Sequence, residues 1–438
     1  MAIVRIAEVE HAPGPRLQAA RLDAPRSGST SETYDFELGG QVAATTSEVE
    51  RVEVRCENRA IAVAQLGERR PEPAEPIGPG EEAATAGTFT ALVGALEAPT
   101  SFELTVRAIL SDGGAPTIAT IRGSREPLSS DHRPRLQPAM INCVGRSGTT
   151  WLAWLMGAHP ELVAFEPFSR ETRVSTYWAT VLQQLGAPNS YLAQFDPVSP
   201  LTGRWWLGDS GVDRRITRDG AVARWLGVER LRLLAGQCQQ QIDRFYRENA
   251  EAGAATRYFV EKFSPSQTIP DLLGEIYPGA REVILVRDFR DMFCSIRAYV
   301  AKRGGSGFRW GEAESEIDYV RTTLRGLASG LLRRWRRRQG LAHLVRYEDL
   351  VLEPNRTLTA LAEYLEIDAG AATIESMLGR ASRALPGKDG HPTAPDPTSS
   401  VGRWRHELSP EVEDALATTL APILEAFGYD ARPTVGRS

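Results

Sequence analysis

The sequence has few cysteines, no long apolar runs and no excess of positive charge. It therefore lacks the usual features of disulfide-rich, membrane-spanning and nucleic-acid-binding proteins. It contains four cysteines in 438 residues, and these are too far apart for metal ligands. We therefore expect buried free thiols rather than disulfides. No apolar run approaches the length of a membrane-spanning helix. A net charge of −5 argues against a general nucleic-acid binder.

The amino terminus shows no secretion signal either. Residues 1–10 contain no basic region followed by an apolar stretch. These absences predict a cytoplasmic protein with no membrane span. What remains is an ordinary globular composition, over a length that suggests two domains with enough residues for a core in each.

Residues 1–122 are predicted to form a small all-β sandwich, an accessory domain. Short runs of alternating apolar and polar residues are separated by Gly, Pro, Asp and Ser, and Asp112-Gly113-Gly114 is a hairpin signal. No pair of carboxylates and no glycine motif suggests catalysis here. A scaffold or a contact within a homo-oligomer is the simpler expectation, and a carbohydrate- or partner-binding module is the alternative. Residues 123–138, polar and proline-bearing, are the expected linker.

The second domain, residues 139–438, is predicted to begin with a strand, a glycine loop and a helix. An apolar run over 139–144 has the length of a buried strand, and helically spaced apolar residues follow the loop. Backbone N–H groups at a helix start can bind an anion. The loop adds glycines for close approach, one cation and three hydroxyls, in the order Gly145, Arg146, Ser147, Gly148, Thr149 and Thr150. It is either a phosphate cradle or an ordinary βα turn whose Ser and Thr cap the helix.

This loop differs from that of the nucleoside triphosphatases. Their pattern ends in Gly-Lys-Ser/Thr, with the hydroxyl on Mg²⁺. Here Gly148 is followed by two threonines. The loop therefore supplies cations and donors without an obvious metal ligand, which favours transfer of a group less charged than a phosphoryl.

Two later strands are predicted to end in cations. Lys262 lies at the mouth of one, where it can contact a leaving phosphate or simply be a surface lysine. The other ends in Arg287, and Ser295 lies in the helix that follows. This pair can clamp a second phosphate by charge and hydroxyl donation. The alternative is a structural ion pair of Arg287 with Asp288 or Asp291.

At this point the sequence resembles a known family. Gly145–Leu152 is similar to the 5′-phosphosulfate loop of the sulfotransferases that use 3′-phosphoadenosine-5′-phosphosulfate (PAPS), although many members have lysine at the position of Arg146. Arg287 and Ser295 resemble the 3′-phosphate motif of the same enzymes. The segment 400–403 falls where the family has a Gly-x-Trp-like sequence. The resemblance covers residues 138–429, and its specificity comes from the order of these motifs.

The resemblance implies both a fold and a reaction. The fold is α/β, with a P-loop-like parallel sheet flanked by helices. The reaction is sulfuryl transfer from PAPS to a hydroxyl or amine of a carbohydrate or small molecule, with no metal required because cationic groups suffice for a weakly charged group. Arg146 and Lys262 would stabilise the leaving phosphate. The implied nucleotide-binding residues are Gly145, Arg146, Ser147, Gly148, Thr149, Thr150, Trp151, Arg287, Ser295, Ser400, Gly402 and Arg403.

Glu166 is the expected general base, because an acceptor must lose a proton. In the small cytosolic members a histidine follows shortly after the strand lysine, but this chain has phenylalanine and serine there. In the tyrosyl-protein branch a catalytic glutamate lies the same short distance past a His-Pro pair as Glu166 does. The alternative is that Glu166 forms an ion pair with Arg170 or Arg173.

The remaining patterns are assigned no chemistry. Residues 170–255 are expected to form an insertion that covers the site or contacts the acceptor. The basic run Leu331–Arg338 is interpreted as a solvated helix face, with attraction of acceptor or nucleotide as the alternative. Arg346–Leu350 is expected to be a structural core element. Two rival functions remain open: a Mg²⁺-dependent kinase, and a binding protein with a vestigial nucleotide site.

Overall fold

The computed structural model describes residues 2–57, 59–67, 87–165, 171–186, 224–250, 252–264, 268–381, 393–394 and 396–431. The chain divides into two compact units. The first comprises residues 1–133 and 176–240, and the second comprises residues 134–175 and 241–438. The sequence analysis placed residues 176–240 in the second domain, whereas here they group with the first unit. The domain limits given there stay a prediction.

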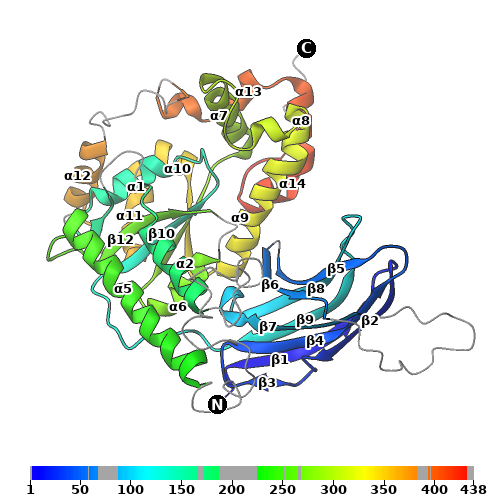
Figure 1. Ribbon diagram of the computed structural model, residues 1–438. Helices are drawn as coiled ribbons and strands as arrows, with labels where there is room; N and C mark the ends of the chain where they lie inside the picture. The colour runs from blue at the N-terminus through cyan, green and yellow to red at the C-terminus, as the bar shows by residue number, and fades with distance from the viewer. Residues whose placement is uncertain are drawn as a thin grey trace, which may run out of the picture. The chain divides into compact units, whose positions relative to one another are not determined.

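The first unit contains the expected antiparallel sheets. One has the strand order β3-β1-β9-β8-β5-β6 and the other β2-β4-β7 (Figure 1). Phe36 of the smaller sheet stacks on Phe102 of the larger, with ring centroids 6.4 Å apart, so the two sheets pack face to face. The strands are β1 (Val4–His11), β2 (Leu17–Ala24), β3 (Thr30–Ser31), β4 (Asp35–Ala44), β5 (Val49–Cys56), β6 (Arg59–Gln65), β7 (Gly87–Gly94), β8 (Ser101–Leu110) and β9 (Thr117–Arg125).

The second unit is built on a parallel sheet, which confirms the predicted fold class. Its strand order is β11-β12-β10-β13-β14, and every pairing is parallel. The central strands β12, β10 and β13 are buried along almost their whole length, as expected of a parallel sheet covered on both faces. Their bounds are β10 (Gln137–Cys143), β11 (Leu162–Val163), β12 (Tyr258–Phe263), β13 (Arg281–Val286) and β14 (Ala342–Arg346).

Helices cover the two faces of this sheet through two separate cores. Along β13, Val283 and Leu285 pack with helices α1, α11 and α12, whereas Ile284 and Val286 pack with α7, α9 and α14 (Figure 1). This alternation is the period of two expected of a strand buried on both sides. The helices of the chain include α1 (Thr149–Gly157), α2 (Val174–Gly186), α5 (Arg230–Asn249), α6 (Ile269–Ile276), α7 (Phe289–Lys302), α8 (Glu316–Tyr319), α9 (Arg325–Arg338), α10 (Tyr347–Leu352), α11 (Pro354–Leu365), α12 (Ala371–Ala381), α13 (Trp404–Glu407) and α14 (Pro410–Ala426).

The packing tests two expectations: that the cysteines are buried, and that Leu331–Arg338 forms a solvated helix face. All four cysteines are buried free thiols, as predicted. No helix among the described residues is long and apolar enough to cross a membrane. The interpretation of Leu331–Arg338 as a solvated face is wrong for Arg334, which is 1% exposed. The reason is a charge partner that lies far away in the sequence.

A buried ion network fixes α9 to the sheet. Arg334 Nε and Nη2 donate to the two carboxylate oxygens of Glu282 on β13 at 2.6 and 3.0 Å, and Nη1 donates to Asp271 at 2.9 Å. Arg338 and Asn142 donate to the same Glu282. The geometry is bidentate and every partner is hydrogen-bonded, which is what allows these charges to be buried.

We predict that Arg334→Met lowers the free energy of unfolding by about 3–5 kcal/mol, because a buried carboxylate loses its bidentate partner. Chemical denaturation followed by circular dichroism measures this change. Arg356→Met is the matched control: Arg356 is 83% exposed and pairs with Glu353 at the surface, so its loss costs at most about 1 kcal/mol. Equal effects of the two substitutions would contradict the assignment.

Candidate nucleotide-binding site

The carboxyl ends of neighbouring parallel strands bring the predicted cations to one edge of the sheet. In register, Cys143 of β10 pairs with Leu285 of β13, and Val286 pairs with Arg346 of β14. The glycine loop, Arg287 and Tyr347 therefore all follow the same edge of the sheet. Open α/β sheets bind ligands at this edge.

The glycine loop turns directly into the first helix of the unit. Gly148 is the N-cap of α1, with φ of +88°, and no side chain caps the helix. A Cβ atom on Gly148 would lie 2.3 Å from the ring of Tyr347. Arg146 also has a positive φ, +71°. The uncapped amides and the tight turn favour an anion site over a turn in which Ser and Thr cap the helix.

The hydroxyl groups of the loop have distinct partners. Ser147 is 1% exposed, and its hydroxyl donates to the carbonyl of Val144 at 2.7 Å, so it stabilises the turn itself. Thr150 Oγ1 accepts a hydrogen bond from Lys262 Nζ at 3.3 Å. Lys262 thus contacts the start of α1.

The two predicted phosphate sites are in direct contact. Arg146 Nε donates to Ser295 Oγ at 3.2 Å, and Arg287 Nη1 donates to the carbonyl of Arg146 at 3.2 Å. Arg287 is 4% exposed, its guanidinium lies 4.6 Å from the ring centroid of Tyr347, and its Nε has no hydrogen-bond partner. A buried, unpartnered donor at this position is what a bound phosphate would satisfy.

Arg287 does not form the structural ion pair that was the alternative interpretation. Asp288 instead binds Arg290, with Nη2 and Oδ2 separated by 2.7 Å. Asp291 accepts from the backbone N–H groups of Gly402 and Trp404 at 2.7 and 3.0 Å. Burial raises the pKa of Asp291 to about 6. No carboxylate of the described residues forms an ion pair with Arg287.

The segment around Gly402 packs against the second predicted phosphate site. Arg287 Nη2 donates to the carbonyl of Ser400 at 2.6 Å, and the hydroxyl of Ser400 is 2.9 Å from that of Tyr347. Arg403 is paired with Glu407 at 2.7 Å and donates to Thr393 Oγ1 at 3.2 Å. Thr393 Oγ1 in turn lies 2.9 Å from Ser295 Oγ. Arg287, Ser295, Ser400 and Arg403 are thus brought into one cluster.

Like charges converge in this cluster. Burial, together with repulsion from Arg287 and Arg403, lowers the pKa of Arg146 to about 10. A protein that holds cations close enough to repel one another gains stability from an anion bound between them. The arrangement therefore has the electrostatics of a receptor for a ligand with several negative charges.

The other predicted residues either lie beside the cluster or are not among the residues that the structure describes. Trp151 is half-buried and packs edge-on against Tyr347, with ring centroids 6.1 Å apart. Glu166 and Arg170 lie outside the residues that the structure describes. Glu171, which the sequence did not single out, forms an ion pair with Lys262 at 3.1 Å.

Sequence reasoning also missed Tyr347 and Thr393. Tyr347 was expected to be only structural, yet it contacts Gly148, Trp151, Arg287 and Ser400. Its position directly after β14 was an available signal, because Arg287 directly follows the neighbouring strand β13. Thr393 carried no comparable signal, since it lies in a long segment with no periodic pattern.

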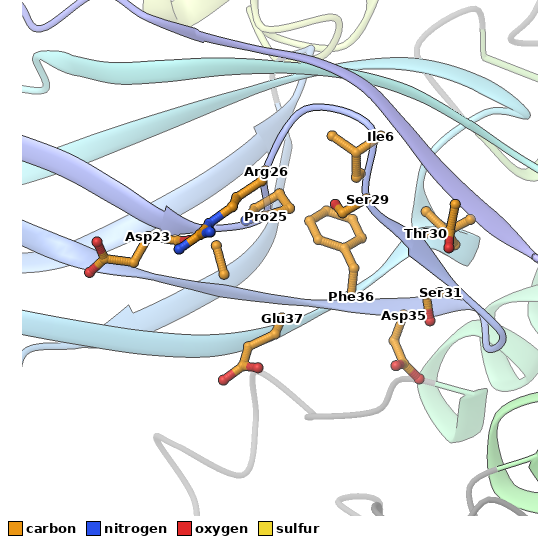
Figure 2. Close-up of a pocket in the computed structure, with 12 residues that line it drawn as sticks. Ile6, Asp23, Pro25, Arg26, Ser29, Thr30, Ser31, Asp35, Phe36 and Glu37 are labelled. Atoms are coloured by element: carbon orange, nitrogen blue, oxygen red, sulfur yellow. The ribbon is translucent and has the colours of Figure 1, made fainter.

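A recess in the first unit lacks comparable chemistry. It is lined by residues of β1 to β4 and the turns between them, and Figure 2 shows Phe36 on one side of β4 with Asp35 and Glu37 on the other. Burial raises the pKa of Asp35, whose carboxylate accepts from Thr33 at 2.8 Å. The carboxylates and the ring do not face a common space, so the recess presents no converging acid pair.

Comparison with known proteins gives one family match and several matches to solved structures. A family model described as "Sulfotransferase family" matches residues 138–370, which include the loop, Lys262 and Arg287. No curated protein matches the chain. Among solved structures, the sulfotransferase domain from the curacin biosynthetic pathway has 18% identity and a TM-score of 0.40, covering 68% of this chain and 99% of that one. A sulfotransferase from Mycobacterium avium has 15% identity and a TM-score of 0.36, covering 68% and 78%. A mouse sulfotransferase complexed with PAP has 12% identity and a TM-score of 0.39, covering 67% and 87%.

We predict that Gly148→Ala weakens binding of 3′-phosphoadenosine-5′-phosphate (PAP) by roughly tenfold or more, because the methyl group meets Tyr347 and the turn is displaced. Isothermal titration calorimetry measures the affinity. Gly274→Ala in α6 is the control, since a Cβ there meets nothing within 4 Å, and it should stabilise the fold by about 0.5–1 kcal/mol without affecting binding. Unchanged affinity in Gly148→Ala would show that the loop is not a cradle.

Proposed function

The chain belongs to the sulfotransferase family, and we propose that it moves a sulfuryl group from PAPS to a hydroxyl or amine of an acceptor. The observation that carries this proposal is the contact between the two anion sites, in which Arg146 bridges the glycine loop to Ser295 and Arg287. A donor with phosphate groups at both its 5′ and 3′ positions suits two adjoining cationic sites better than a singly charged ligand does.

Different residues of this cluster would bind different ends of the nucleotide. The amides at the start of α1, with Arg146, Thr149 and Thr150, would hold the 5′-phosphosulfate end. The 3′-phosphate would be held by Arg287 and Ser295. Ser400, Gly402 and Arg403 would close over it, and Trp151 would lie beside the nucleotide. The unpartnered Nε of Arg287 and the uncapped helix start both fit such a ligand.

The same side chains account for the chemistry. An acceptor oxygen or nitrogen attacks sulfur in line, the bond from sulfur to the 5′-phosphate oxygen breaks, and negative charge collects on that oxygen. Arg146, Lys262 and the α1 amides stabilise this charge, which is the largest contribution in most transfers of this kind. The acceptor proton passes to a carboxylate, for which Glu166 is our candidate from the sequence.

A direct test separates this reaction from kinase chemistry on a similar fold. Transfer of radiolabelled sulfate from PAPS to a panel of glycans, phenols and other small molecules should proceed in EDTA, because the sulfuryl group carries too little charge to need a bridging cation. Carbohydrates and small molecules are the favoured acceptors. Transfer that requires ATP and Mg²⁺ would favour the kinase, and absence of PAP binding by calorimetry would favour a binding protein.

We predict that Glu166→Gln lowers kcat by about 10²–10⁴-fold while leaving PAP affinity unchanged, because it removes the proton acceptor but no contact to the nucleotide. Steady-state kinetics and calorimetry provide the two measurements. Glu353→Gln, at an exposed surface pair, is the control and should keep wild-type rates. A Glu166→Gln enzyme with wild-type turnover would remove Glu166 from the mechanism.

A further inference from the structure

Lysine is nearly absent from this protein. Of its 51 lysines and arginines, only Lys262, Lys302 and Lys388 are lysine. Lys302 is exposed at the end of α7, and Lys388 lies outside the described residues. The side chain of Lys262 is 8% exposed. A chain that uses arginine almost everywhere has placed a lysine where the start of α1 meets the end of β12.

Lysine and arginine are not equivalent at such a position. An ammonium is a compact point charge that can be directed at a single oxygen, whereas a guanidinium is a broad planar fork. The cost is that a buried ammonium loses its proton more readily than a guanidinium does. A lysine that must neutralise a leaving oxygen therefore needs something nearby that keeps it charged.

Glu171 occupies the position where such a group is needed. Its Oε1 lies 3.1 Å from Lys262 Nζ, and the same Nζ donates to Thr150 Oγ1 in the first turn of α1. Glu171 precedes α2 and its side chain is 50% exposed. The ammonium is thus held between a carboxylate on the solvent side and the helix start on the protein side.

The charges around Lys262 act in opposing directions. Burial lowers the pKa of Lys262, and the positive charge of Arg173 lowers it further. Glu171 opposes this by charge and by its hydrogen bond, and Cys143 on β10 acts in the same direction as Glu171. Burial raises the pKa of the Cys143 thiol to about 12, so that thiol is neutral at ordinary pH. Among the described residues, Glu171 is therefore the carboxylate that favours the charged form of the ammonium.

We propose that Glu171 is a positioning residue that keeps Lys262 protonated and directed at the start of α1, where the bond from sulfur to the 5′-phosphate oxygen breaks. This inference rests on the proposed function. During transfer, Lys262 keeps its proton and neutralises the oxygen that leaves sulfur, while the acceptor proton goes to the general base. Glu171 acts only through Lys262, so its role differs from that expected of Glu166.

A plain surface ion pair is the competing explanation. Exposed pairs contribute at most about 1 kcal/mol and leave the chemistry of their partners unchanged. The two explanations differ in what Glu171→Gln does to the proton affinity of Lys262. They also differ in whether an arginine at position 262, which keeps its proton without help, removes the need for Glu171.

Nuclear magnetic resonance measures the first difference without any substrate. In protein labelled with ¹³C at lysine, the signal of Lys262 is identified by its loss in Lys262→Arg, and its shift is followed against pH. We expect Glu171→Gln to move the midpoint of Lys262 to lower pH, Glu171→Asp to move it less, and Glu353→Gln not at all. An unchanged midpoint in folded Glu171→Gln overturns the proposal, whatever the activity.

Kinetics measure the second difference. We expect Glu171→Gln to lower kcat by roughly tenfold, the effect of one lost charge-assisted hydrogen bond, and to shift the alkaline limb of kcat/KM to lower pH. In a Lys262→Arg background, Glu171→Gln should cost nothing further and that limb should stay in place. An equal loss in both backgrounds overturns the proposal. Failure of the wild-type protein to bind PAP would instead contradict the proposed function. The two failures can be told apart because the Lys262 titration needs no nucleotide.

Discussion

The site depends on holding several cations together at the carboxyl edge of a parallel sheet before any ligand is present. Like charges in a partly buried cluster repel, and burial together with that repulsion lowers the pKa of Arg146. The chain limits the cost in different ways at each cation. Arg403 is neutralised by Glu407 and Lys262 by Glu171, whereas Arg287 is held by two backbone carbonyls and the face of Tyr347. Arg287 thus keeps a charge that no described carboxylate neutralises.

Rigid packing makes this arrangement possible. Arg287 directly follows β13, which is buried on both faces. The hydrogen bonds between Glu282 of β13 and Arg334 of α9 hold this strand in place. Asp291, in the first turn of α7, holds the backbone of Gly402 and Trp404 through two hydrogen bonds. A site built on strands and helix starts keeps its donors in place without a ligand, which lowers the reorganisation needed on binding.

Much of this could be predicted from local sequence. The glycine loop after a buried strand, and the Arg287 and Ser295 pair after another, are patterns of adjacent residues, so the parallel sheet and the convergence of cations follow from strand ends alone. The interactions that sequence reasoning missed join residues far apart. Arg334 looked solvent-exposed because its partner Glu282 lies 52 positions away, and nothing in the sequence paired Glu171 with Lys262, 91 positions apart. The grouping of 176–240 with the β-rich unit likewise depends on contacts between residues that are far apart in the sequence.

The central claim is that one nucleotide spans the two adjoining anion sites. Calorimetric titration of PAP and of adenosine 5′-phosphate, which lacks the 3′-phosphate, into the wild-type protein and Arg287→Met tests it most directly. We expect the wild-type protein to prefer PAP by about ten- to a hundredfold, the contribution of charge-assisted hydrogen bonds to one phosphate, and Arg287→Met to lose that preference while still binding adenosine 5′-phosphate. An unchanged preference for PAP in a folded Arg287→Met protein would contradict the claim.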